Sequence, residues 1–192
     1  MSDRVYCYPD SNVLKNKLNI QDLDTLYNVE RKLTSLRLME LLTKPISGNF
    51  DLRHLRSIHK YIFQDIYEWA GEIRTVNIEK GNMFCNVLFI ESQAEEIFLS
   101  LKKERFLNGM KYDHFVKRLA YYFSEINALH PFREGNGRSQ REFIRQLALK
   151  NGYVINFRMI TEEEMLAASE QSFLCKYELM ENIFKDCISI KK

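Results

Sequence analysis

The segment from His130 to Arg141 lies between two stretches of helical hydrophobic periodicity, and this placement constrains the fold more than any other feature of the chain. Upstream, apolar residues recur at steps of four and three: Phe115, Leu119, Tyr122, Ile126 and Leu129. Downstream, the pattern resumes with Phe143, Ile144, Leu147 and Ala148 and is stopped by Asn151-Gly152. Each stretch predicts a helix with one buried stripe. The segment is therefore predicted to be a loop that joins two packed helices and opens the second.

A glycine-containing loop that opens a helix is a natural site for an anion. The loop reads His130-Pro131-Phe132-Arg133-Glu134-Gly135-Asn136-Gly137-Arg138. The first N–H groups of a helix lack internal partners, and the helix dipole favours negative charge there. Gly135 and Gly137 can adopt conformations that are closed to residues with a Cβ, and so let phosphate oxygens approach the backbone.

The side chains of the loop complete the inventory of a triphosphate-binding site. Arg138 and Arg141 carry forked donors that suit phosphate, and Glu134 can hold Mg²⁺ through one oxygen. His130 is the group whose pKa is ordinarily near neutral. Each residue alone has a structural explanation, such as a turn glycine or a solvated arginine. A chance match to the whole pattern is on the order of one in a hundred million, which favours function.

The chain resembles the Fic-domain proteins, whose signature H-x-F-x-[D/E]-G-N-G-R-x-x-R is matched from His130 to Arg141 at every defined position. Residues 50–74 also resemble the helix and turn that precede the active site in that family. The resemblance implies an all-α fold, a helical bundle with one short β-hairpin near the active site. It implies a single Fic domain over residues 1–192, with its core at about 50–160.

The resemblance further implies transfer of AMP from Mg-ATP to a Ser, Thr or Tyr hydroxyl of a target protein, which can be the enzyme itself. His130 would be the base and Glu134 would place Mg²⁺. The backbone of Gly135 to Gly137, with Asn136 and Arg138, would bind the α-phosphate, and Arg141 would position the γ-phosphate. Pro131 and Phe132 would shape and anchor the loop.

Other activities remain open on the same loop. Relatives with a degenerate loop act as kinases, and the intact glycines favour AMP transfer instead. A different donor, such as UTP or CDP-choline, would preserve the loop and alter only the base pocket. A catalytically silent interaction module would keep the fold without the chemistry. The resemblance also leaves a homo-oligomer open.

Residues 74–90 switch to an alternating pattern and predict a β-hairpin with Gly81-Asn82 at its turn. In Fic proteins the corresponding hairpin, called the flap, lies over the active site and holds the target's backbone by strand addition. The flap candidates here are Ile78, Lys80, Gly81 and Phe84.

The C-terminal segment, about 174–188, is expected to be an inhibitory helix. Fic proteins are often restrained by a motif [S/T]-x-x-x-E-[G/N], whose glutamate pairs with the second arginine of the signature. Glu181 and Asn182 match this motif, while Tyr177 stands where Ser or Thr is expected. The resemblance therefore implies that Glu181 pairs with Arg141.

The remaining helices are predicted from periodicity and capping residues. A first amphipathic helix is expected to bury the stripe Leu23, Leu26, Val29, Leu33 and Leu36. Asp51 is expected to cap the next helix, and Ser92 and Thr161 to begin capping boxes. His54 and His59 are expected to serve packing rather than metal binding.

Composition excludes several classes of function. The 192 residues include 28 basic and 26 acidic ones, so charge gives no case for a nucleic-acid surface. No apolar run approaches the length of a membrane span, and the N-terminus lacks the order of a signal peptide. Cys7, Cys85, Cys175 and Cys187 show no C-x-x-C spacing, which predicts free thiols and a cytoplasmic protein.

Overall fold

The structure is a computed structural model that describes residues 4–80 and 82–191, and α-helices dominate this part of the chain. The helices are α1 (Leu23–Thr43), α2 (Leu52–Phe63), α3 (Ile90–Lys103), α4 (Tyr112–Leu129), α5 (Asn136–Lys150), α6 (Glu162–Phe173) and α7 (Glu178–Cys187). The strands are β1 (Glu79–Lys80), β2 (Asn82–Met83), β3 (Tyr153–Ile155) and β4 (Ile188–Ile190). Short 3-10 turns occupy η1 (Val87–Phe89), η2 (Arg105–Leu107) and η3 (Phe157–Met159). The prediction of an all-α fold with a short hairpin is confirmed.

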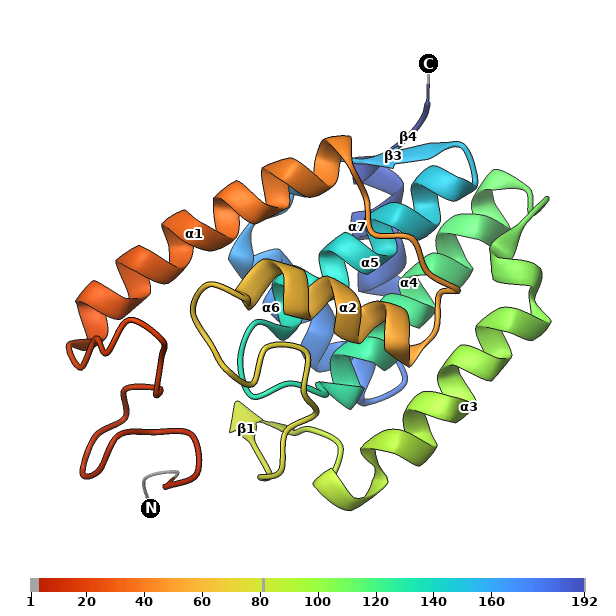
Figure 1. Cartoon of the computed structure of the whole chain (residues 1–192). Helices are drawn as coiled ribbons and strands as arrows, with labels where there is room; N and C mark the ends of the chain where they lie inside the picture. The colour runs from red at the N-terminus through yellow and green to blue at the C-terminus, as the bar shows by residue number, and fades with distance from the viewer. Residues whose placement is uncertain (1–3, 81, 192) are drawn as a thin grey trace.

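Helix α5 lies at the centre of the bundle, between α2 on one side and α4 on the other (Figure 1). Helix α4 also packs against α3 and α7, and α6 packs against α7. The predicted stripes of α4 and α5 are both buried, from Phe115 to Leu129 and from Phe143 to Ala148. Two buried helices thus meet at the loop between Leu129 and Asn136, which fixes its position in the core.

Helix α1 runs along the edge of the bundle beside α2 and buries a different face from the predicted one (Figure 1). Leu23 and Leu36 are 57% and 54% exposed, so the predicted leucine stripe is wrong at both ends. The residues that α1 buries are Leu26, Glu30, Thr34 and Leu41. Glu30 and Thr34 are polar, and both bind the side chain of Arg138. These contacts explain why α1 turns a different face toward the bundle from the predicted one.

Two of the three predicted helix starts are confirmed. The Asp51 carboxylate accepts a hydrogen bond from the backbone N–H of His54 at 2.8 Å, and Thr161 forms a capping box with Glu164. The capping box at Ser92 is wrong, because α3 already begins at Ile90. The turn η1 precedes it directly and starts the helical path earlier, so the Ser92 hydroxyl lies inside the helix and donates to the carbonyl of Phe89.

The sequence predicted one of the two small sheets in the described part of the chain. The predicted hairpin is present as β1 and β2, with Glu79 opposite Met83, although its strands are short and its turn residue Gly81 lies outside the described residues. The antiparallel pair of β3 and β4 was not predicted, and it ties the C-terminal strand to the end of α5. All four cysteines are free, as expected. No helix in the described part of the chain is long and apolar enough to cross a membrane.

Candidate active site

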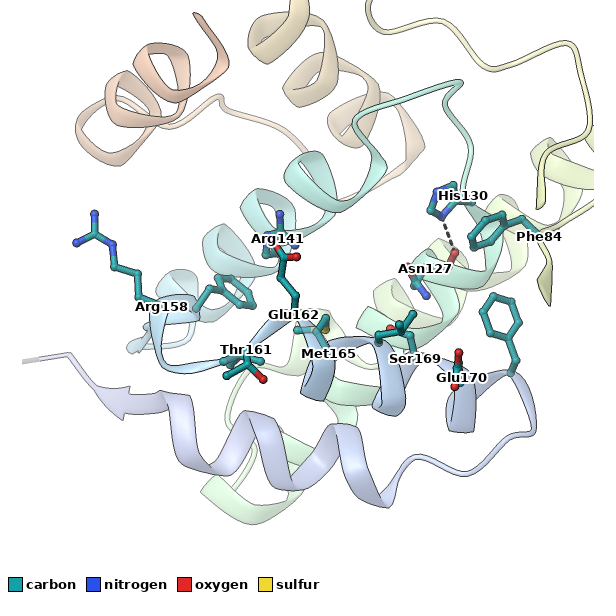
Figure 2. Close-up of a pocket in the computed structure, with 14 residues that line it drawn as sticks. Phe84, Asn127, His130, Arg141, Arg158, Thr161, Glu162, Met165, Ser169 and Glu170 are labelled. Atoms are coloured by element: carbon teal, nitrogen blue, oxygen red, sulfur yellow. Dashed lines mark hydrogen bonds between the residues drawn. The ribbon is translucent and has the colours of Figure 1, made fainter. Parts of the chain in front are cut away.

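His130 ends α4 and begins the loop in a left-handed backbone conformation, with φ at 44°. Its Nδ1 lies 3.1 Å from the carbonyl oxygen of Asn127 (Figure 2). A carbonyl oxygen only accepts, so Nδ1 donates and the neutral ring carries its lone pair on Nε2. Phe84, from the segment after β2, stacks on the imidazole with ring centroids 3.6 Å apart. The ring is thereby oriented from two sides.

Arg74 joins the loop to the hairpin. Its Nε donates to the carbonyl of His130 at 2.8 Å, its Nη1 to the carbonyl of Val76, and its Nη2 to the carbonyl of Cys85. The side chain is 1% exposed, and burial lowers the pKa of its guanidinium. Sequence reasoning gave Arg74 no role, because three backbone carbonyls leave no pattern of residue types.

His59 supports the loop from beneath. The Gly71 N–H donates to Nδ1 at 2.8 Å, so Nε2 donates to the carbonyl of Glu134 at 2.9 Å. Burial lowers the pKa of His59 to about 3, which keeps the ring neutral. Phe132 is fully buried and stacks on His59 at 3.9 Å between centroids. Phe132 thus packs in the core next to the loop, and His59 contributes both packing and hydrogen bonds.

The two glycines of the loop serve different purposes. Gly135 has φ at 80°, and a Cβ there would lie 2.1 Å from Cζ of Phe63. Gly137 lies in the first turn of α5, and a Cβ there would meet only the Arg141 side chain, at 3.4 Å. Gly135 therefore uses a backbone conformation that is closed to residues with a Cβ, whereas Gly137 has a helical backbone and leaves space beside Arg141.

Asn136 closes the loop on itself. Its side-chain oxygen accepts from the N–H of Phe132 at 2.9 Å, and its amide nitrogen donates to the carbonyl of the same residue at 2.8 Å. The residue is 6% exposed. Both ends of the amide thus help to hold the loop in shape, and the second N–H of the amide stays available to a phosphate.

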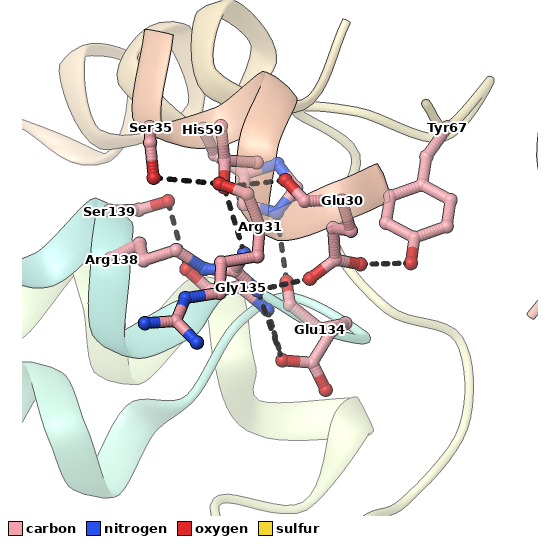
Figure 3. A network of polar contacts seen from close by, with 10 residues as sticks. Glu30, Arg31, Ser35, His59, Tyr67, Glu134, Gly135, Arg138 and Ser139 are labelled. Atoms are coloured by element: carbon pink, nitrogen blue, oxygen red, sulfur yellow. Dashed lines mark hydrogen bonds and ion pairs between the residues drawn. The ribbon is translucent and has the colours of Figure 1, made fainter. Parts of the chain in front are cut away.

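Arg138 is held by α1, a contact that sequence reasoning missed (Figure 3). Its Nη2 lies 2.5 Å from Oε1 of Glu30, and its Nη1 donates to the hydroxyl of Thr34 at 3.1 Å. Its guanidinium carbon lies 4.6 Å from the centre of the Phe63 ring. No sequence signal marked Glu30 and Thr34, because α1 carries many other polar and charged residues.

Arg141 has no hydrogen bond or ion pair among the described residues. Burial and the nearby charge of Arg138 lower the pKa of its guanidinium, and Glu162 opposes this shift. A partly buried guanidinium without a direct ion pair favours an anionic ligand. Arg141 therefore differs from Arg138, whose charge is already paired.

Two cavities meet at His130 and Arg141. One, of about 540 Å³, lies between the loop and α6, and its surface is mainly apolar, with Phe157, Ile160 and Met165 set among polar side chains (Figure 2). The other is a polar cleft of about 760 Å³ lined by the loop and by residues of α1. The residues that line both are Phe84, His130, Arg141 and Glu162. An elongated ligand with an apolar and a charged end could occupy both spaces.

Glu134 offers one carboxylate to the polar cleft. Its Oε1 accepts from the N–H of Gly135 at 2.9 Å, and its side chain is 42% exposed. Within the described residues no group of three or more His, Cys, Asp or Glu could hold a metal ion alone. A single carboxylate fits Mg²⁺ that brings most of its ligands with it as phosphates and waters.

Two of the four flap candidates lie at the site. Ile78 and Phe84 line the polar cleft. Lys80 belongs to β1, whose backbone pairs with β2, and Gly81 lies outside the described residues. Pro131 is buried, and its carbonyl accepts from the N–H of Arg74 at 2.9 Å.

Glu181 does not meet Arg141, which corrects the expected inhibitory pair. Its Oε1 lies 3.9 Å from Nζ of Lys117, on α4. Asn182 is exposed, and the hydroxyl of Tyr177 donates to Glu125 at 2.8 Å. The predicted helix exists as α7, but it packs on α4 and α6, and Arg141 lines a cavity to which no residue of α7 contributes among those described.

Known proteins are similar to this chain in sequence and in fold. A model described as the Fic/DOC family matches residues 49–148. The chain is 43% identical over 185 residues to protein adenylyltransferase VbhT of Bartonella schoenbuchensis, an alignment that covers 96% of this chain and 39% of VbhT. It is 37% identical to the probable protein adenylyltransferase Fic of Salmonella typhimurium, over 96% of this chain and 92% of that protein.

A solved structure supports the same relationship. The N-terminal Fic domain of a VirB-translocated Bep effector protein from Bartonella quintana, with bound ADP, matches with a TM-score of 0.93 and 30% identity. The match covers 100% of this chain and 98% of that one. The signature loop, the helices that flank it and the match to the family model agree. The chain belongs to the Fic/DOC family.

Proposed function

We propose that this chain is a protein adenylyltransferase, which transfers AMP from Mg-ATP to a hydroxyl group of a protein. The observation that carries the proposal is the meeting of an apolar cavity and a polar cleft at His130 and Arg141. A nucleotide has the same division, because its base is flat and weakly polar and its phosphates are charged. The names of the relatives, protein adenylyltransferases, support the same activity.

The reaction needs one proton acceptor. The hydroxyl oxygen of the target attacks the α-phosphorus, and the bond from that phosphorus to the oxygen that bridges the α- and β-phosphates breaks. Pyrophosphate leaves, and AMP stays attached to the target. The proton of the hydroxyl passes to His130, whose Nε2 carries the lone pair when Nδ1 donates to Asn127. His130 lines both cavities, so it stands where the phosphate chain and an incoming hydroxyl would meet.

Two kinds of hydrogen-bond donor and one ligand for a metal ion are available to the phosphates. The first N–H groups of α5 face the loop and lack acceptors within the helix. Arg138 and Arg141 add guanidinium groups on the same helix. Glu134 would hold Mg²⁺, and neutralisation of charge on the α- and β-phosphates is the chemistry that the ion supplies when bound.

The hairpin is the element that we assign to the target. Strands β1 and β2 are short, and Met83 is 70% exposed, so the hairpin can accept a further extended segment. Phe84 follows directly and stacks on His130. A segment added to the hairpin would therefore carry its hydroxyl toward the imidazole. The acceptor is a Ser, Thr or Tyr of another protein or of the enzyme itself.

The position of the label in the nucleotide tests the proposal. The purified chain is incubated with Mg²⁺ and with ATP labelled at the α- or the γ-phosphate, alone and with a cell extract. We expect protein to take up the α-label and not the γ-label. Uptake of the γ-label would show a kinase, uptake from UTP or CDP-choline in place of ATP would show another donor, and no uptake from any donor would show a silent module.

A further inference from the structure

Helix α1 buries two polar residues against the loop in place of the leucines that its sequence led us to expect. Glu30 is 8% exposed and Thr34 is 1% exposed. A buried carboxylate is costly unless it is paired and hydrogen-bonded. The partners of Glu30 therefore show what this helix does for the site.

Glu30 uses both of its oxygens. Oε1 lies 2.5 Å from Nη2 of Arg138, and Oε2 accepts from the hydroxyl of Tyr67 (Figure 3). Tyr67 is 1% exposed and stacks on Trp69 at 4.2 Å between centroids. Burial and the Glu30 charge raise the pKa of Tyr67, so its hydroxyl stays a donor. The hydrogen bond from Tyr67 therefore fixes the Glu30 carboxylate in the orientation in which it binds Arg138.

Arg138 is in turn fixed on several sides. Thr34 donates its own proton to the carbonyl of Glu30 at 2.8 Å, so its oxygen accepts from Nη1 of Arg138 at 3.1 Å. Phe63 lies against the face of the guanidinium. An arginine has five N–H donors, and these contacts leave others for a ligand in the cleft. The orientation of the guanidinium is thus set before any phosphate arrives.

Two carboxylates compete for Arg138, and the geometry favours one. The same Nη2 lies 2.5 Å from Glu30 and 3.7 Å from Oε1 of Glu134. The Glu30 side chain is 11% exposed, whereas the Glu134 side chain is 42% exposed and faces the cleft. Because Glu30 takes the charge of Arg138, the Glu134 carboxylate is left available to a metal ion.

We propose that Glu30 is a positioning residue of the phosphate site, which orients Arg138 toward the polyphosphate and keeps it from approaching Glu134 more closely than 3.7 Å. This inference rests on the proposed function, because it assigns Glu134 to Mg²⁺ and Arg138 to phosphate. Glu30 lies outside residues 49–148, the part that matches the family model, so α1 contributes to a site that the matched segment does not complete.

The test is a Glu30→Gln substitution, which keeps the volume and removes the charge. Binding of a nonhydrolysable ATP analogue is measured by calorimetry over a series of Mg²⁺ concentrations. We expect affinity to fall about fivefold in Mg²⁺, which corresponds to about 1 kcal/mol. We also expect the half-saturating Mg²⁺ concentration to rise, because Arg138 turns to Glu134. A merely structural loss would leave that concentration unchanged and would overturn the proposal.

A second variant protects the test against misfolding. Tyr67→Phe keeps the buried ring and removes only the hydroxyl that fixes Glu30, so it should shift both quantities in the same direction by a smaller factor. The matched controls are Glu40→Gln and Tyr61→Phe, which break an exposed Tyr–Glu contact of 2.8 Å between α1 and α2. These controls should leave nucleotide binding and its Mg²⁺ dependence unchanged.

The outcomes separate the inference from the function on which it rests. Wild type that neither binds the analogue nor transfers AMP would overturn the proposed function. Wild type that does both, with Glu30→Gln indistinguishable from it, would overturn only the role of Glu30. Tighter binding in Glu30→Gln would also overturn it, since Glu30 would then compete with phosphate.

Discussion

The inner and outer faces of the signature loop differ in how completely their polar groups are satisfied. On the inner face, toward α1 and α2, Arg138 is paired, His59 uses both ring nitrogens and Gly135 lies against Phe63. On the outer face, toward α6, Arg141 has no hydrogen bond or ion pair among the described residues. The inner face holds the loop in shape and orients Arg138 in the polar cleft, and the outer face leaves Arg141 for a ligand. Substitutions on the two faces should therefore separate stability from activity.

The largest effect on activity is expected at His130, on the outer face. His130→Ala should lower the rate of AMP transfer by at least about 10²-fold, because it removes the proton acceptor. Nucleotide affinity should persist, since the phosphate donors lie elsewhere. Single-turnover transfer from α-labelled ATP and calorimetric binding measure the two quantities. Transfer close to the wild-type rate would remove His130 from the mechanism.

A comparison of the two glycines tests the inner face next. Gly135→Ala places a side chain at φ 80° and 2.1 Å from the Phe63 ring, so it should destabilise the fold by about 2 kcal/mol or more. Gly137→Ala should leave stability nearly unchanged and weaken nucleotide binding, because its Cβ enters the space beside Arg141. Urea denaturation and nucleotide titration compare them. Equal loss of stability in both would contradict the division of faces.

The two arginines give the sharpest contrast, at an intermediate size. Arg138→Ala leaves the buried Glu30 carboxylate without its counter-ion and should cost about 1–3 kcal/mol of stability. Arg141→Ala breaks no ion pair and should not destabilise the fold. Both should weaken nucleotide binding. Thermal or urea unfolding of the two variants measures the difference in stability. If Arg141→Ala were destabilised as much as Arg138→Ala, Arg141 would also have a structural partner.

Acid should loosen the inner face through His59. Its pKa is lowered to about 3 in the fold from an ordinary 6.5, so protonation favours the unfolded chain and stability is lost as pH falls below about 6.5. The contribution between pH 6.5 and 5.5 is about 1 kcal/mol. His59→Gln should flatten this part of the stability profile, and the exposed His114→Gln should not. A profile unchanged in His59→Gln would refute the assignment.

The smallest effect is expected at Glu181, which lies on neither face of the loop. Its partner is Lys117, whose side chain is 65% exposed, and pairs of this kind contribute little. Glu181→Ala should change the transfer rate by less than about twofold. A gain of about tenfold, or about 1.4 kcal/mol of barrier, would restore the inhibitory role that the sequence motif suggested.

The sequence predicted what depends on neighbouring residues. The α4 and α5 stripes, the loop between them and the caps at Asp51 and Thr161 follow from local periodicity and hydrogen bonding, and all are present. The predicted start of α3 at Ser92 was wrong because the turn η1 leads directly into the helix at Ile90.

Contacts between distant segments could not be predicted in the same way. The buried face of α1 is decided by Arg138, which is 108 residues from Glu30 in the chain, and periodicity carries no trace of such a partner. The placement of Glu181 depends on how α7 packs, which a short motif with one departure does not determine. The hydrogen bonds between the Asn136 amide and the backbone of Phe132 depend on the shape of the loop, which residue type alone does not determine.

Arg74 has a consequence for motion. One rigid guanidinium holds the backbone of His130 and the two sides of the hairpin, at Val76 and Cys85. The hairpin and the backbone of His130 are therefore bound to the same side chain. If an incoming polypeptide displaced the hairpin, His130 would move with it. Capture of a target and alignment of the proton acceptor would then be a single coupled event.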